Sequence, residues 1–354
     1  MASIVDLPSL VDCLGDQPRE RFQRLFWVDQ VMGSLRLPSG ARALAEQRFG
    51  SATELERQHV IRVVNQFTFE GALYNPVRGR RPLPFGEPGS VAQDSTSPFA
   101  HPLRDTSADV FGRVRGRHCI TAANLARWEG WHGVLIFDEP DPLRISAEAL
   151  KDAFAVSLAW ARCAHRCDPQ ARYFVWMWNG GLKGGASVAH AHAQMALGRT
   201  RHYARVEFLR RIACEYHARF GSNYFQDLLA AHADLGLSFQ SGGVAGFVYL
   251  TPVRPKEIWL LGTALDDDLA LAVHKALRNL IEHTQTQSFV AIAFLPPLFD
   301  RDTTEDWSGF PAIVRLADRG PVNMVASDIG AIDLYAHASI SADPFVVRAA
   351  LKGL

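Results

Sequence analysis

Apolar and polar positions change rhythm several times in the middle of the chain. The short apolar runs that predict strands cover residues 118–120, 133–137, 173–178 and 188–197. Between the second and third runs, Ser146 can cap a helix whose apolar positions Leu150, Phe154 and Leu158 recur at helical spacing. The pattern therefore predicts the order strand, strand, helix, strand, glycine-rich turn, strand.

A similar order returns in the last third of the chain. Two apolar runs predict a hairpin, a helical pattern follows, and two more strand-like runs come after it. These elements cover residues 244–250, 257–261, 266–283, 289–295 and 312–316. Asp343 and Pro344 then suit the cap and first turn of a closing helix. We predict an α+β fold with two tandem halves, each an antiparallel sheet with helices packed on it.

Three domains follow from this division. Residues 1–65 carry apolar positions at roughly helical spacing and predict a helical N-terminal segment. Residues 66–221 form the first half, which closes with an amphipathic helix and Gly221 as its stop signal. Residues 222–354 form the second half. A stretch rich in proline, glycine, serine and aspartate at 82–108 predicts a long loop of the kind that often covers a site.

The composition narrows the class of protein. The 354 residues are 48% hydrophobic, and 37 basic residues balance 37 acidic ones, so no global charge favours nucleic acid or a membrane surface. The first ten residues do not resemble a signal peptide, and no apolar run approaches a membrane span. Five cysteines without a Cys-x-x-Cys pair indicate a reducing compartment. We expect a cytoplasmic protein.

Residues 178–199 contain the candidate chemistry. If residues 188–197 form a strand, His190, His192 and Gln194 lie on one face and the alanines between them on the other. The preceding turn offers backbone N–H groups that can bind phosphate oxygens. Its glycines are Gly180, Gly181, Gly184 and Gly185. A phosphate cradle beside a row of imidazoles indicates phosphorus chemistry with histidine as nucleophile.

Other interpretations of the same stretch stay open. In a helix, His190 and Gln194 would share a face and His192 would lie apart. A His-x-His pair on a strand is also a common metal site. The glycine spacing is not that of a Walker loop, because Lys183 is not followed by a hydroxyl residue. The glycine turn favours phosphorus chemistry, because a purely structural strand seldom needs four glycines before it.

These residues resemble the transferase branch of the histidine triad superfamily, which includes galactose-1-phosphate uridylyltransferase and the diadenosine tetraphosphate phosphorylases. That branch carries an Asn, a glycine-containing turn, a Ser and then His-x-His-x-Gln. Here the matching residues are Asn179, the turn 180–185, Ser187, His190, His192 and Gln194. Further likenesses are residues 74–76 with Arg80, Arg81 and Pro82, residues 124–137, and residues 330–333. The resemblance touches most of residues 66–354, and two histidine-triad-like halves follow from it.

The resemblance also implies roles for individual residues. His192 is expected to attack the α-phosphorus and carry the nucleotide covalently, with His190 orienting it or handling a proton. Gln194 replaces the third histidine of the hydrolase branch, and an amide holds a phosphoryl oxygen without acting as a general acid or base. The remaining predicted site residues bind substrate: Ser187, Asn179, Gly184, Gly185, Lys183, Arg80, Arg81, Asn124 and Asp333.

Departures from the pattern limit what the resemblance implies. The Cys-x-x-Cys pair that holds a structural metal in some uridylyltransferases is absent, and residues 311–315 lack a second His-x-His. We therefore predict no metal ligands and leave a divalent metal open. Asp333 stands where the hexose-binding Glu of uridylyltransferases is expected and Ser339 where a Gln is expected. Galactose-1-phosphate is therefore in doubt as the acceptor.

The predicted function is nucleotidyl transfer or phosphorolysis. The substrate is a nucleoside diphosphate sugar or a dinucleoside polyphosphate, the acceptor is phosphate or a sugar phosphate, and family analogy adds a homodimer. The alternatives are a nucleotide hydrolase of the same superfamily and a non-catalytic nucleotide-binding protein.

Overall fold

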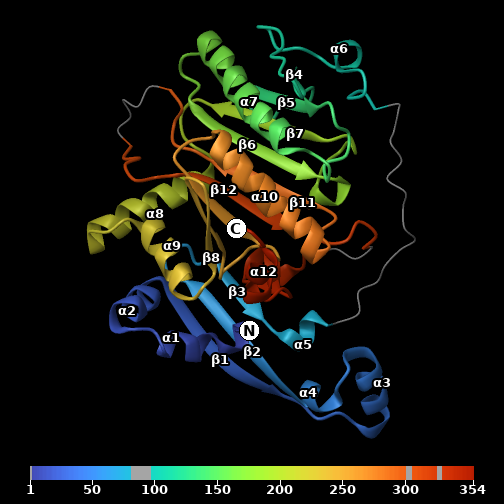
Figure 1. Cartoon of the computed structure of the whole chain (residues 1–354), viewed down its shortest axis with the longest axis vertical. Helices are drawn as coiled ribbons and strands as arrows, with labels where there is room; N and C mark the ends of the chain where they lie inside the picture. The colour runs from blue at the N-terminus through green and yellow to red at the C-terminus, as the bar shows by residue number, and fades with distance from the viewer. Residues whose placement is uncertain (1, 81–96, 300–304, 325–328) are drawn as a thin grey trace.

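The computed structural model describes residues 2–80, 97–299, 305–324 and 329–354. Within these ranges the strands are β1 (Phe26–Ser34), β2 (Arg57–Asn65), β3 (Gly71–Tyr74), β4 (Cys119–Ala123), β5 (Trp131–Phe137), β6 (Tyr173–Gly180), β7 (His192–Gly198), β8 (Ser238–Ser241), β9 (Val244–Val248), β10 (Ile258–Gly262), β11 (Phe289–Phe294), β12 (Ala312–Asp318) and β13 (Ala338–Ile340). The α-helices are α1 (Leu7–Asp12), α2 (Asp16–Leu25), α3 (Ser39–Phe49), α4 (Ala52–Glu56), α5 (Pro76–Gly79), α6 (Pro102–Asp105), α7 (Ala147–Cys167), α8 (Ala204–Phe220), α9 (Tyr224–Asp234), α10 (Asp267–Thr284), α11 (Ala331–Tyr335) and α12 (Pro344–Ala350), with short 3-10 turns η1 (Ile4–Asp6) and η2 (Leu182–Gly184). The chain is α+β, as predicted (Figure 1).

The large sheet is antiparallel throughout and has the strand order β4-β5-β7-β6-β11-β12-β10-β9-β8. Strands β4, β5, β7 and β6 follow one another in the same way as β9, β10, β12 and β11, and the two groups meet where β6 pairs with β11. In chain order, α7 lies between the second and third strands of the first group, and α10 lies at the same place in the second. The order predicted twice from the sequence is therefore present twice in the sheet.

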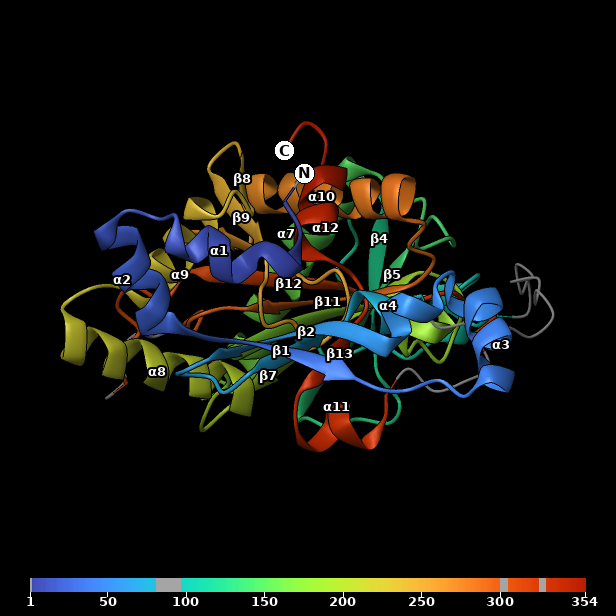
Figure 2. The same ribbon diagram turned by 90° about the horizontal axis from the view of Figure 1, so that it is seen from below.

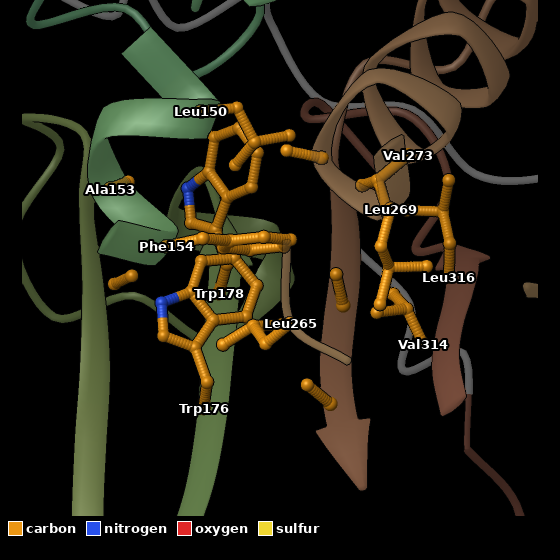
Figure 3. Close-up of a cluster of buried hydrophobic side chains, with 14 of the residues drawn as sticks. Leu150, Ala153, Phe154, Trp176, Trp178, Leu265, Leu269, Val273, Val314 and Leu316 are labelled. Carbon is orange, nitrogen blue, oxygen red and sulfur yellow. The ribbon is translucent and has the colours of Figure 1, made fainter. Parts of the chain in front are cut away.

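Helices α7 and α10 cover one face of this sheet. Their apolar sides pack on alternate residues of the strands, and Phe154 of α7 meets Trp176 of β6 with ring centroids 5.1 Å apart. Figure 3 shows this layer, with side chains of α7 and β6 on one side and those of α10 and β12 on the other. The two predicted caps are confirmed, because Ser146 accepts a hydrogen bond from the Ala149 amide and Asp343 accepts one from the Phe345 amide.

The opposite face is covered unevenly. Over the second group of strands, α8, α9 and the N-terminal elements form a second apolar layer with residues of β9 to β12, and Figure 2 shows β1 and β2 on the side away from α10. Over the first group, Phe99 is the one described hydrophobic residue outside β4 and β5 that packs against a small cluster of their side chains. This thinly covered face carries the candidate site.

The N-terminal segment was predicted to be helical, but it is not wholly helical. Helices α1 to α4 agree with the predicted helical segment, but residues 26–34 and 57–65 are strands that pair antiparallel along their full length. With β3 and β13 they form a second sheet of order β1-β2-β3-β13, in which β13 runs parallel to β3. The β-branched residues Val60, Ile61, Val63 and Val64 favour a strand once a partner strand is present.

Among the described residues, no helix combines the length and the apolar character that crossing a membrane requires.

Candidate active site

The glycine-rich turn connects the end of β6 to the segment before β7. Gly181 and Gly185 adopt φ values of 82° and 103°, a left-handed backbone that side chains disfavour. A Cβ atom on Gly184 would lie 2.5 Å from the Phe289 carbonyl oxygen, so the turn packs against the backbone at the start of β11. Asn179 donates from Nδ2 to the Gly185 carbonyl at 3.4 Å. Two of these glycines are therefore required by backbone conformation and a third by close packing.

Strand β7 presents the predicted polar face. Ala193 and Met195 point into the core beneath α7, so His192 and Gln194 point to the opposite, thinly covered face. The strand begins at His192 rather than at residue 188, and His190 lies in the bend before it. The helical interpretation of this stretch is wrong, because β7 pairs with both β5 and β6.

The two nitrogens of His192 have different environments. Nδ1 lies 2.8 Å from the His190 carbonyl oxygen, which can only accept, so Nδ1 carries the proton. In the neutral ring Nε2 then keeps its lone pair. The side chain is 4% exposed, and Phe99 packs edge-on against the ring at a centroid distance of 5.0 Å. Burial lowers the pKa of His192, which keeps the imidazole neutral at neutral pH.

His190 is held to the end of β5. Its Nε2 donates to the Phe137 carbonyl oxygen at 2.8 Å, and its ring also meets Phe99 at 6.3 Å. The backbone around it is tied down as well, since the Ala191 amide donates to the Pro140 carbonyl at 2.7 Å. His190 therefore fixes the entry into β7 and, through its own carbonyl, the orientation of the His192 ring.

Gln194 has a partner that sequence reasoning missed. Its Oε1 lies 2.8 Å from Nε2 of His132, a buried residue of β5, and Asn124 lies 3.3 Å from the same ring nitrogen. The sequence places His132 at the start of a strand without indicating that this strand lies beside β7. Asn124 contacts His132 and accepts a hydrogen bond from the Ala126 amide, and its contact with substrate stays a prediction.

Other predicted residues surround the glycine turn. Ser187 is exposed in the segment that leads to His190. Lys183 is half-buried, and its Nζ lies 3.4 Å from the Met324 carbonyl oxygen. Gly184 and Gly185 lie with them in the connection between β6 and β7, and Asn179 lies at the end of β6. Their contact with a substrate stays a prediction.

Arg80 and Asp333 lie elsewhere in the structure. Arg80 follows α5 and pairs with Glu54 of α4, at the other end of the molecule from β5 and β7 (Figure 1). Asp333 accepts hydrogen bonds from the Gly330 and Ser339 amides at 2.9 and 3.0 Å and lines a cavity of about 560 Å³ beside Arg205 of α8. The structure brings neither to His192. Arg81 lies outside the described residues.

In the part of the chain that the structure describes, no three His, Cys, Asp or Glu side chains are grouped closely enough to hold a metal ion.

No protein-family model and no curated protein sequence matches the chain. Among solved structures it is similar to ADP-glucose phosphorylase from Arabidopsis thaliana with bound ADP-glucose, with a TM-score of 0.60, 15% identity, and coverage of 80% of this chain and 95% of that one. A GalT-like protein from Arabidopsis thaliana has a TM-score of 0.57 and 16% identity, covering 77% and 94%. A uridylyltransferase has a TM-score of 0.56 and 17% identity, covering 83% and 99%.

These likenesses confirm the predicted resemblance at the level of fold. The chain has a GalT-like α+β fold, and the similar structures are of phosphorylases and uridylyltransferases.

Proposed function

We propose that the protein is a nucleotidyltransferase or phosphorylase that carries a nucleoside monophosphate on Nε2 of His192. Nε2 attacks the α-phosphorus of a nucleoside diphosphate sugar or dinucleoside polyphosphate, a P–N bond forms, and the bond from phosphorus to the bridging oxygen breaks. The sugar phosphate or nucleoside polyphosphate leaves. An oxygen of phosphate or of a sugar phosphate then attacks the same phosphorus, and the P–N bond breaks to regenerate the neutral imidazole.

One contact carries this proposal. The hydrogen bond from Nδ1 of His192 to the His190 carbonyl holds the proton on Nδ1 and leaves the Nε2 lone pair for attack. Burial favours the neutral, nucleophilic ring over the imidazolium. His190, held by the Phe137 carbonyl, acts as the orienting residue.

The surroundings of His192 support transfer to a phosphate-bearing acceptor. The carboxamide of Gln194 can donate to a phosphoryl oxygen but cannot deprotonate a water molecule. The glycine turn at the end of β6, with Ser187 and Lys183 beside it, is the segment proposed to bind the phosphates. ADP-glucose is the first substrate to test, because the similar structure from Arabidopsis thaliana binds it.

We further infer that the chain consists of two related, histidine-triad-like halves, of which one keeps the nucleophile. The repeated strand order supports this, as does the pairing of the two groups through β6 and β11. Met177 of β6 pairs with Ile292 of β11. On the next strand in each direction, Gln194 of β7 pairs with Met177 and Arg315 of β12 pairs with Ile292, so Gln194 and Arg315 occupy matching positions. Ile313 then stands where His192 stands in the first half, so the second half has no equivalent nucleophile.

The experiment is intact-protein mass spectrometry after incubation with a panel of nucleotides. The panel contains ADP-glucose, UDP-glucose and diadenosine tetraphosphate, each without added phosphate. We expect the mass of one nucleoside monophosphate to appear and to be lost when phosphate is added. The variant His192→Asn keeps a donor for the His190 carbonyl but has no nucleophilic nitrogen, so it gains no mass.

The matched control is His217→Asn, which changes an exposed histidine of α8 and leaves the adduct intact. A hydrolase would discharge the nucleotide to water without phosphate. Absence of any adduct and of any turnover across the panel would contradict the proposal and favour a non-catalytic binder.

A further inference from the structure

His132 is a buried histidine whose position on β5 brings it against Gln194. The side chain is 1% exposed, and the Trp128 ring packs on it at a centroid distance of 4.4 Å. Its Nε2 lies 2.8 Å from Gln194 Oε1 and 3.3 Å from Asn124 Nδ2. A ring nitrogen can make only one of these bonds, and the shorter contact indicates that Nε2 carries the proton and donates to Gln194.

The other nitrogen of His132 lies apart from polar groups. Nδ1 is buried and has no hydrogen-bond partner among the residues that the structure describes. A buried polar atom without a hydrogen bond destabilises the fold, so packing alone gives no reason to place an imidazole here. The Trp128 ring packs on the imidazole, while Asn124 and Gln194 both face its Nε2. What the histidine adds is the single N–H group that contacts Gln194.

We infer that His132 is a positioning residue that fixes the orientation of the Gln194 carboxamide, and this inference rests on the proposed function. With Oε1 held by His132, the NH₂ group of Gln194 points the other way and is available as a donor. The α-phosphoryl oxygens of a nucleotide are anionic and need donors, so the opposite orientation would present an acceptor to them. His132 thus acts through Gln194 and does not itself touch the phosphate.

The second half of the sheet uses the same position in the same way. One row of paired residues runs across the sheet through Val134, Gln194, Met177, Ile292, Arg315 and Trp259. His132 precedes Val134 by two residues and holds Gln194, while Glu257 precedes Trp259 by two residues and accepts from Arg315 Nε at 2.7 Å. In the first half, Gln194 is therefore held by His132, and in the second half Arg315 is held by Glu257. In each case the holding residue precedes by two positions the strand residue that pairs with the held one.

The test compares four variants by the rate at which His192 acquires the nucleotide. His132→Phe removes the N–H donor and keeps a ring, His132→Gln places an amide N–H at about the same reach, and Gln194→Leu removes the carboxamide. We expect His132→Phe to slow transfer about tenfold, the effect of losing one hydrogen bond. His132→Gln restores most of the rate.

The double variant His132→Phe/Gln194→Leu is the decisive one. It is expected to be no slower than Gln194→Leu alone, because His132 acts only through Gln194. A purely structural role would instead multiply the two losses. Thermal unfolding of each variant identifies loss of fold, and the rates of variants that stay folded decide the outcome.

A measurement on the unreacted protein separates this inference from the proposed function. Long-range ¹H–¹⁵N NMR spectra are expected to show His132 as the neutral Nε2–H tautomer, with its Nε2–H signal shifted in Gln194→Leu. An Nδ1–H tautomer, or an imidazolium at neutral pH, would overturn the inference even if the nucleotide adduct forms. The expected tautomer without any adduct on wild-type protein would contradict only the proposed function and leave the Gln194 orientation standing.

Discussion

At His192, the hydrogen bond that fixes the ring also selects its reactive atom. The backbone carbonyl that takes the Nδ1 proton belongs to His190, whose own ring is fixed by the carbonyl at the end of β5. Two hydrogen bonds to backbone atoms thus define the direction in which Nε2 points. Such bonds do not depend on flexible side chains. This suits Nε2, which the proposed reaction requires to be aligned with phosphorus.

The first prediction at this scale concerns pH. Burial lowers the pKa of His192 below its ordinary value near 6.5, so the ring stays neutral to a lower pH than a free histidine does. Transfer of the nucleotide to the enzyme is therefore expected to be constant at neutral pH and to fall on acidification with a midpoint below about 6.5. Single-turnover rates of adduct formation measure this profile. A midpoint above about 6.5 would show that the imidazole is not the buried, neutral group described here.

The sequence predicts some site residues better than others. Alternation along β7 is a local property, so the shared face of His192 and Gln194 and the burial of the alanines between them followed from it. The contact between His132 and Gln194 joins residues on different strands and depends on β5 lying beside β7, which no local pattern shows. Asp333 was predicted to bind substrate from its place in the sequence. In the structure its carboxylate accepts hydrogen bonds from the backbone amides on either side of α11.

At the scale of elements, the glycine turn connects β6 to the segment before β7 and is the element proposed to bind the phosphates. Its conformation requires left-handed residues, and its contact with the start of β11 requires the absence of a side chain at residue 184. The sequence indicated both the turn and its position shortly before the two histidines. It did not indicate the packing on Phe289, because β11 lies more than a hundred residues further along the chain.

A substitution in this turn tests its role. In Gly184→Ala the new Cβ meets the Phe289 carbonyl oxygen at 2.5 Å, a backbone atom that cannot move aside cheaply. We expect the turn to shift, nucleotide transfer to fall at least about tenfold, and stability to drop by about 1–3 kcal/mol. Adduct formation and thermal unfolding measure the two effects.

Gly40→Ala in α3 is the matched control, because a Cβ there meets nothing within 4 Å. It is expected to leave both quantities unchanged or to raise stability slightly. Equal behaviour of Gly184→Ala and Gly40→Ala would show that the turn tolerates a side chain and does not position the phosphates.

Strand boundaries and the N-terminal strands show where local patterns fail. The strand predicted at 188–197 begins at His192, because His190 before it is held by a hydrogen bond to the Phe137 carbonyl at the end of β5. Residues 57–65 were assigned to a helical segment, yet they pair with β1 on one side and β3 on the other. Pairing with distant residues outweighed the apparent helical spacing.

For the whole molecule, a buried charge cluster joins the small sheet to the second half of the large one. Arg315 of β12 contacts Glu257, which precedes β10, at 2.6 Å, and Glu70, which precedes β3, at 3.1 Å. The side chains of all three residues are 11% exposed or less. Arg315, which lies at the position proposed to match Gln194, is thus paired with two acidic residues and covered by the N-terminal region.

Removing this arginine tests the account of the assembly. Arg315→Met removes the cation that pairs with the buried Glu257 and one of the two that pair with Glu70, which keeps Arg205, and is expected to destabilise the fold by about 3–5 kcal/mol. The exposed pair of Arg278 with Glu282 on α10 provides the control, since Arg278→Met is expected to cost about 1 kcal/mol or less. Urea unfolding of both variants measures the difference. Losses of similar size would mean that the cluster does not tie the two sheets together.

The most direct test of the central claim is to locate the phosphorus on the trapped nucleotidyl enzyme. Protein with ¹⁵N-labelled histidine, charged with the nucleotide that gives an adduct, is analysed by peptide mapping and by ³¹P–¹⁵N coupling. The account predicts a phosphoramidate on Nε2 of His192 that phosphate discharges and that His192→Asn abolishes. A nucleotide bound to Nδ1 of His192 or to any other residue, or the absence of a covalent nucleotide throughout turnover, would contradict it.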